Sequence, residues 1–186
     1  MVKNQTASIA DSAQRATRAH FLFVAAYMLA SIIFDSWNLI AREAVGRRWL
    51  AAGLLLALNT ILWYLAHTRL RRASNYQLII LALVVADLIF AGLNVYWERG
   101  MAATNVLLFA VPLVTAAVLR SRVALVAAAT LATAAYAAAT VKYFFDFYGE
   151  GYRVQLYGQV VFYGLVFYAL AWLLLVVADA PRGKRG

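Results

Sequence analysis

Residues 77–96 read QLIILALVVADLIFAGLNVY, a run of twenty residues in which Asp87 is the single charged side chain. An α-helix rises about 1.5 Å per residue, so about twenty apolar residues match the hydrocarbon core of a bilayer. Backbone groups find no water inside lipid, and a helix satisfies them internally. This stretch therefore predicts a transmembrane helix that carries one carboxyl group near its middle.

Five further apolar stretches flank this one, and short polar connections separate them. Hydrophobic residues make up 65% of the 186 positions, against roughly 45–50% in ordinary soluble domains. Short connections place consecutive helices side by side and antiparallel. The sequence predicts an all-α integral membrane protein, a compact bundle of six transmembrane helices. The expected parts are a polar N-terminal segment 1–20, spans at about 21–40, 49–66, 77–96, 104–119, 123–141 and 156–178, and a short basic tail 179–186.

The basic residues indicate the orientation. Six spans place both termini on one face, and that face holds 11 of the 17 Lys and Arg residues. The positive-inside rule then predicts that both termini are cytoplasmic, with the three arginines of the 42–48 loop as the exception. Anionic lipid headgroups are the expected contacts of these basic groups. Nucleic-acid binding is not expected, because it needs a basic stripe on a water-facing fold.

Asp87 is the first candidate functional residue, because an ionisable group inside lipid is energetically costly. Its side chain is expected to face the protein interior, a water pocket, or a hydrogen-bonding partner such as Asn59 in the second span. The pair is either a structural link between two helices or a proton or cation site. A single ionisable group at this depth favours the structural interpretation.

Further polar residues lie near the outer face, at the ends of the predicted spans that are opposite to the chain termini. If the helices form a bundle, these ends converge and can line an outward-opening pocket. Lys142 and Asp146 are four residues apart and can pair on one helical face. The alternative is that all are interfacial residues, with Lys142 reaching the headgroups. The candidates for this pocket are Asp35, Asn38, Asn94, Trp97, Glu98, Asn105, Lys142 and Asp146.

Other features favour structural roles. Pro112 removes a backbone donor inside the fourth span and is a candidate hinge. The fifth span is rich in alanine, which favours close packing either at the centre of the bundle or at a subunit interface. His20 and His67 are expected near the cytoplasmic boundary; two histidines can hold a haem, but no cofactor is predicted for helix-end residues of this kind. The chain has no cysteine and no metal-binding or catalytic motif, so no metal site and no enzyme are expected.

One resemblance rests on motifs between residues 77 and 147. They comprise Asp87 in the third span, the turn 94–100 that reads NVYWERG, Pro112 in the fourth span, and the basic turn 120–122 before the alanine-rich span. This order resembles the six-span membrane sensor region of some bacterial sensor histidine kinases. The resemblance implies a bacterial cytoplasmic membrane. Only eight residues follow Ala178, so we expect a sensor-like module without a kinase domain, which would act through a partner.

Three hypotheses about function follow. The first is a non-enzymatic sensor-like or scaffolding module that binds a small or lipidic ligand, or another membrane protein. The second is a small transporter or channel subunit that works as a homo-oligomer and uses Asp87. The third is an accessory subunit of a larger membrane complex.

Overall fold

The structure, a computed structural model, describes residues 2–37, 42–68, 70, 72–98, 104–148 and 154–179. Asn38 lies outside these ranges. The regular elements within them are all helical, which confirms the predicted fold class at this level. In chain order they are α1 (Val2–Ser36), α2 (Arg42–His67), α3 (Ala73–Trp97), the 3-10 helix η2 (Thr104–Phe109), α4 (Ala110–Ala117), α5 (Arg122–Tyr148) and α6 (Val154–Asp179).

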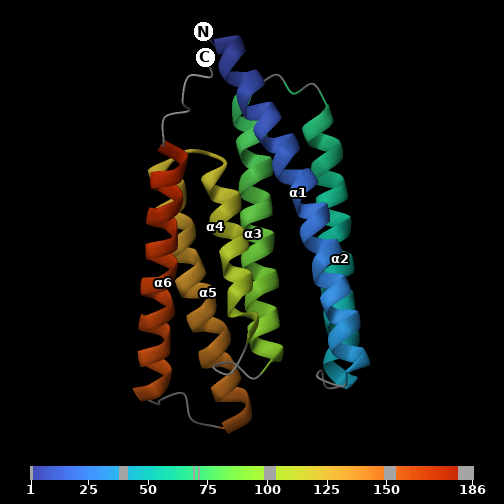
Figure 1. Cartoon of the computed structure of the whole chain (residues 1–186), viewed down its shortest axis with the longest axis vertical. Helices are drawn as coiled ribbons and strands as arrows, with labels where there is room; N and C mark the ends of the chain where they lie inside the picture. The colour runs from blue at the N-terminus through green and yellow to red at the C-terminus, as the bar shows by residue number, and fades with distance from the viewer. Residues whose placement is uncertain are drawn as a thin grey trace.

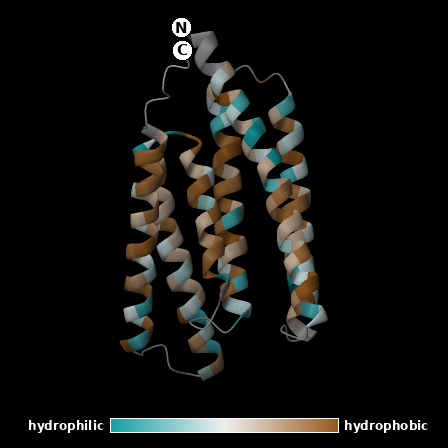
Figure 2. Ribbon diagram, in the orientation of Figure 1, coloured by the Kyte–Doolittle hydropathy of each residue, from teal (hydrophilic) through white to brown (hydrophobic). Residues whose placement is uncertain are grey.

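Five of these helices are long and apolar enough to cross a membrane: Ala7–Ser36, Ala44–His67, Ala73–Trp97, Arg122–Tyr148 and Val154–Ala178. Exposed apolar side chains such as Leu22, Leu54 and Leu165 cover their outer surfaces. Figure 2 shows apolar segments along most of the helix lengths and polar ones mainly toward the ends. These features are compatible with a multi-pass membrane protein.

The fourth predicted span differs from the other five. Asn105–Ala117 is apolar but shorter than a full span, and its first part is a 3-10 helix. Pro112 lies in the first turn of α4, just after the change from 3-10 to α geometry. Proline has no N–H to donate to the preceding turn, so it suits the first turn of an α-helix. The candidate hinge therefore lies next to a change of helix type.

The first two helices begin earlier than predicted. Residues 2–20 are not a separate polar segment but the first half of α1. Ala13, Ala16, Thr17 and His20 form a buried stripe on it, with the spacing of one helical face. The arginines expected in a 42–48 loop belong to the first turns of α2. Hydropathy averaged along the chain did not predict these two helix starts, because such an average does not show which face of a helix is polar.

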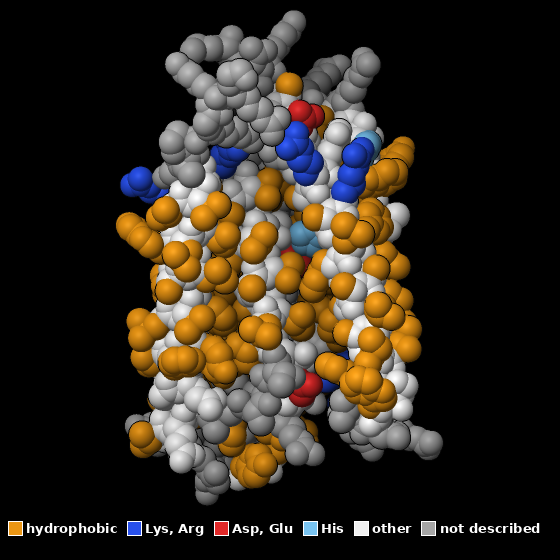
Figure 3. Space-filling view, viewed as in Figure 1, with side chains coloured by type: hydrophobic (Ala, Val, Ile, Leu, Met, Phe, Trp, Pro, Cys, Tyr) orange, Lys and Arg blue, Asp and Glu red, His pale blue; other side chains and the backbone are white. Residues whose placement is uncertain are grey.

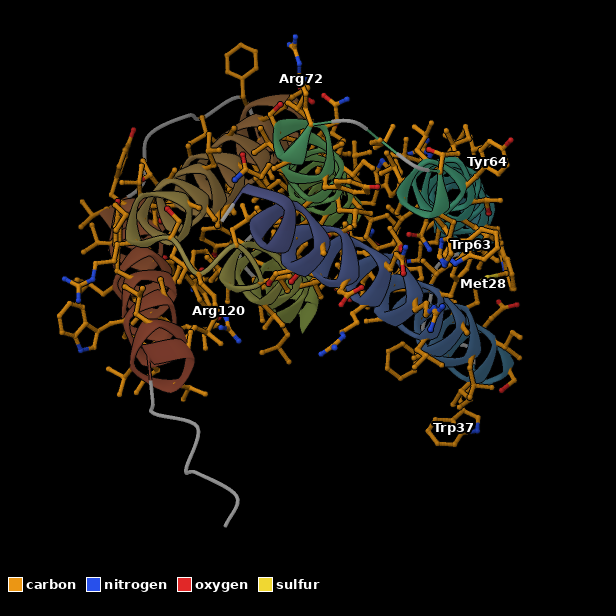
Figure 4. All side chains as sticks on the ribbon, turned by 90° about the horizontal axis from the view of Figure 1, so that it is seen from above. Met28, Trp37, Trp63, Tyr64, Arg72 and Arg120 are labelled. Atoms are coloured by element: carbon orange, nitrogen blue, oxygen red, sulfur yellow. The ribbon has the colours of Figure 1, made fainter. Side chains whose placement is uncertain are left out.

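The bundle is arranged around α3, which contacts α1, α2, η2, α4 and α5, while α6 packs on α4 and α5. In Figures 1 and 4, α2 and α6 lie at opposite sides of the assembly. Figure 4 also shows Trp37 and Tyr64 pointing away from the bundle. The first turns of α1 and the last turns of α6 lie at the same end (Figure 1), which we call the proximal end; the opposite end is the distal end.

Three apolar clusters fill the interior. The largest joins α3 to η2, α4, α5 and α6, with Phe109 and Tyr136 fully buried in it. The other two lie among α1, α2 and α3, one around Ile80 and Leu83 and the other around Val24 and Phe90. Ala128, Ala129 and Ala132 of α5 are buried in the first cluster, which confirms the predicted close packing of the alanine-rich helix.

Candidate functional site

Buried polar residues form two groups along the contact between α1 and α3. His20 bonds to Asp87, and seven residues further along each helix Tyr27 bonds to Asn94. Both bonds join residues 67 positions apart, so the two helices run parallel with a constant register. Seven residues correspond to about 10 Å of helix. The interior therefore holds a polar ladder with two rungs, one at mid-height and one nearer the distal end.

The first rung is a buried histidine–carboxyl pair. His20 Nε2 lies 2.8 Å from Asp87 Oδ2, and the two residues are 4% and 1% exposed. The apolar clusters around Leu83 and around Phe90 lie on either side of it along the helices. A charge in such surroundings is tolerated only when it is paired or neutralised.

The bonds of His20 define where its protons lie. Nδ1 lies 2.8 Å from the Ala16 carbonyl oxygen, which can only accept, so Nδ1 carries a hydrogen. The remaining proton lies between Nε2 and Asp87 Oδ2. The pair is neutral overall whichever of these atoms holds that proton. Thr115 lies beside it, 3.4 Å from both atoms, but its hydroxyl donates to the Val111 carbonyl at 2.9 Å.

The prediction that Asn59 is a hydrogen-bonding partner of Asp87 is wrong. Asn59 is fully buried, as an interior polar residue should be. Its Nδ2 donates to the Thr17 carbonyl at 3.1 Å, so it links α2 to α1 rather than to Asp87. Asn59 Oδ1 and Asp87 Oδ1 are both buried and have no hydrogen-bond partner among the described residues. The mid-height region therefore offers two unused acceptor oxygens.

The second group, which we call the distal cluster, consists of Tyr27, Ser31, Arg48, Asn94, Glu98 and Asn105. The Tyr27 hydroxyl donates to Asn94 Oδ1, and the buried Ser31 lies one helical turn further along α1. Arg48 Nη2 donates to Glu98 Oε1 at 3.0 Å, and the Asn105 backbone N–H donates to Glu98 Oε2 at 3.1 Å. The cluster thus connects α1, α2, α3 and η2 at one level of the bundle.

A pocket of about 210 Å³, which we call the distal pocket, lies against this cluster. Arg48 is only 4% exposed, and it lines the pocket together with Asn105. Arg48 Nε and Asn105 Nδ2 are buried and have no hydrogen-bond partner within the described part of the chain. The remaining lining residues are Phe23, Ala26, Tyr27, Ala30, Ser31, Phe34 and Leu108.

The other predicted pocket residues lie elsewhere. Lys142 Nζ and Asp146 Oδ2 are 2.9 Å apart, which confirms the predicted pair, and Tyr96 donates to the same oxygen at 2.7 Å. This group lies on the exposed α3–α5 side. Trp97 lines an apolar groove between α2 and α3, and Asp35 is exposed on the last turn of α1. The prediction of one pocket shared by all the candidates is therefore wrong: among the described candidates, only Asn94, Glu98 and Asn105 lie together.

The two histidines also differ from the expectation of two neighbouring helix-end residues. His20 is buried at mid-height in the bundle, whereas His67 ends α2 and is exposed. His67 Nδ1 bonds to the Trp63 carbonyl and Nε2 contacts Arg18. Among the described residues, no group of three or more His, Asp or Glu side chains could hold a metal ion.

Sequence reasoning missed His20, Tyr27, Ser31 and Arg48 as site residues. A signal for two of them was present, because His20 and Tyr27 in one helix have the same seven-residue spacing as Asp87 and Asn94 in another. Arg48 had no such signal, since a position near a span end is also typical of an interfacial arginine.

No family model matches the chain, and no curated protein or solved structure is significantly similar to it. Figure 3 shows that blue side chains gather toward the proximal end of the visible face, while apolar side chains cover its middle. The buried polar groups and the distal pocket beside them are therefore the features of the molecule that bear on its function.

Proposed function

We propose that this chain is a non-enzymatic, sensor-like membrane module that binds a small lipid-soluble ligand in the distal pocket. One observation supports the proposal: two buried nitrogen donors, Arg48 Nε and Asn105 Nδ2, have no hydrogen-bond partner among the described residues and belong to residues that line a pocket with mainly apolar walls. A buried donor without a partner costs about 1–3 kcal/mol, and a ligand that accepts from it removes that cost. Pockets with apolar walls and a few convergent polar groups are typical ligand sites.

Occupancy of the pocket can affect several helices at once. The distal cluster joins α1, α2, α3 and η2 through Tyr27–Asn94 and Arg48–Glu98. A ligand that accepts from Arg48 and Asn105 bonds to α2 and η2 while it packs on α1. Different affinities of the ligand for two helix arrangements would shift the population between them, which is what a sensor requires.

The test is to fill the pocket. Ala26 lines it, whereas the adjacent exposed Ala25 does not. We expect native mass spectrometry of the protein purified from its own membrane to show a bound non-protein mass. The mass should persist in Ala25→Phe and disappear in Ala26→Phe. A bound mass that is unchanged in Ala26→Phe, or no bound mass in the unaltered protein, would overturn the proposal.

The proposed membrane, topology and lipid contacts follow from the resemblance to the membrane sensor regions of histidine kinases. On that basis we propose a bacterial cytoplasmic membrane, cytoplasmic termini, and anionic headgroups against the basic proximal end. A module of this kind acts through another membrane protein or a second copy of itself. The exposed apolar flanks of its helices are compatible with either partner.

A second candidate, a small transporter or channel subunit that uses Asp87, is favoured by the His20–Asp87 pair. The shared proton can move without any change in net charge, and Asp87 Oδ1 and Asn59 Oδ1 are unused acceptors for a proton or cation. In reconstituted vesicles, Asp87→Asn should then abolish a proton or sodium flux that Asp146→Asn leaves intact. No flux in the unaltered protein, or equal flux in Asp87→Asn, would exclude this candidate.

A further inference from the structure

We infer that the ligand of the distal pocket is an electrically neutral compound that presents a carbonyl oxygen on an apolar body. This inference rests on the proposed function and adds the chemical class. Three independent properties of the pocket lead to it: the charge balance, the type of unused polar atom, and the size and nature of the walls.

The charge balance favours a neutral ligand. Among the described residues that line the pocket, Arg48 is the single formally charged one, and its Nη2 lies 3.0 Å from Glu98 Oε1. The two side chains cancel within the bundle. An anionic ligand would bring a second negative charge next to Glu98, and a cationic ligand would lie beside Arg48. Like charges at such distances in a poorly solvated site are strongly unfavourable.

The unused polar atoms here are both donors. Arg48 Nε and Asn105 Nδ2 each have an N–H group to give, and they come from different elements that meet at the pocket. By contrast, the two unused atoms at mid-height, Asp87 Oδ1 and Asn59 Oδ1, are acceptors. A carbonyl oxygen has two lone pairs and no hydrogen, so it matches donors of this kind. A hydroxyl or amine ligand would bring a further hydrogen, whereas both buried atoms without a partner among the described residues of this cluster are donors.

The walls define the rest of the ligand. Phe23, Phe34 and Leu108 supply apolar contacts, and Ala26 and Ala30 leave room between them. At about 210 Å³ the pocket is smaller than the roughly 300–1,000 Å³ of sites for drug-sized molecules. It therefore holds one ring or a short acyl group. Phe34 is 37% exposed, so the remainder of the ligand can extend past it into the bilayer. A quinone ring and the carbonyl of a fatty ester share this chemistry.

The test uses four tritiated probes with the same alkyl chain: an alkyl benzoquinone, a methyl ketone, the corresponding fatty acid as its anion, and the alkane. Binding is measured by scintillation proximity on the purified full chain in nanodiscs. We expect saturable binding of one or both carbonyl probes, at least ten-fold tighter than that of the fatty-acid anion or the alkane. Preference for the benzoquinone would identify a ring as the ligand head, and preference for the ketone would identify an acyl group.

Two variants connect binding to the named atoms. Asn105→Leu removes Nδ2 at similar volume, and Arg48→Lys keeps a cation opposite Glu98 but removes Nε. Each should weaken carbonyl binding about ten-fold, while Lys142→Gln on the α3–α5 side should not change it. Circular dichroism confirms folding, and Asn105→Leu alone suffices if Arg48→Lys does not fold.

The outcomes separate the two proposals. Tighter binding of the fatty-acid anion that still depends on Asn105 would overturn the neutral class but keep the distal pocket as a ligand site. Equal binding of the alkane and the ketone would overturn carbonyl recognition. If no probe binds saturably and Ala26→Phe also leaves the mass of the natively purified protein unchanged, both the ligand class and the proposed function fail.

Discussion

His20 and Asp87 share one hydrogen-bonded proton, and both side chains are almost completely buried in the bundle. The Ala16 carbonyl holds the other ring hydrogen of His20, so the imidazole has a defined orientation. The pair is neutral as a unit, but each residue alone would be a buried group without its partner. The effects of substituting the two residues on the free energy of unfolding should therefore not be additive.

A double-mutant cycle measures this dependence. His20→Leu and Asp87→Leu should each lower the free energy of unfolding by about 2 kcal/mol or more, because each leaves a buried polar group unpaired. The double variant should be more stable than the sum of the two losses predicts, with a coupling of about 1–3 kcal/mol. Reversible unfolding by dodecyl sulfate in mixed micelles, followed by circular dichroism, gives these values.

His67→Leu is the matched control for that cycle, because His67 is exposed. It should change the free energy of unfolding by no more than about 0.5 kcal/mol. Strict additivity of the His20 and Asp87 substitutions would show that the two side chains do not form a coupled pair.

The second rung of the ladder gives a simpler prediction. Tyr27→Phe removes one hydroxyl and leaves Asn94 Oδ1 without its donor, which should destabilise the protein by about 1–2 kcal/mol. Tyr64→Phe removes the same atom from an exposed position and should have almost no effect. Equal stability of the two variants in the same unfolding assay would contradict the proposed role of the Tyr27–Asn94 bond.

At the scale of elements, the sequence predicted helices well and their polar faces poorly. Asp87 stood out because it is surrounded by apolar residues along the chain. His20 did not, since Arg18 and other polar residues precede it, and yet the α1 stripe Ala13, Ala16, Thr17 and His20 is buried. The partner of a polar residue depends on the register between helices, which side-chain packing determines. Hydropathy along one segment contains no information on that register.

The close approach of α5 and α6 depends on Gly164. A Cβ atom at this position would lie 3.0 Å from Thr133 Cγ2, whereas one at Gly158 would meet no atom within 4 Å. Gly164→Val should therefore destabilise the protein by about 1–3 kcal/mol relative to Gly158→Val. Comparing the two variants cancels the change in helix propensity, because both replace glycine with valine within α6. Equal unfolding free energies would show that α5 and α6 do not pack this closely.

At the scale of the whole molecule, a few polar residues are buried among the apolar clusters of the interior, and apolar residues also cover the outside. Asp87, Asn59, Asn94 and Arg48 are buried, whereas many large apolar side chains of α1, α2 and α6 are exposed. The length and composition of the apolar stretches predicted helices that are long and apolar enough to cross a membrane, and five such helices are present among the described residues. Which polar residues meet in the interior could not be predicted, because such a prediction requires the register between every pair of packed helices.

The orientation and the fourth crossing can be tested together by thiol labelling, because the chain has no cysteine of its own. Ser74 precedes most of α3 and Ser121 directly precedes α5, so both lie on the proximal side if η2 and α4 return the chain across the membrane. Ser36 and Gln155 lie on the distal side, at the end of α1 and the start of α6. With cytoplasmic termini, a membrane-impermeant maleimide should label Ser36→Cys and Gln155→Cys in intact cells. Ser74→Cys and Ser121→Cys should react only after permeabilisation.

Labelling of Ser121→Cys but not Ser74→Cys in intact cells would mean that α4 does not complete a crossing. A reversed labelling pattern at all four positions would place the termini on the outer face.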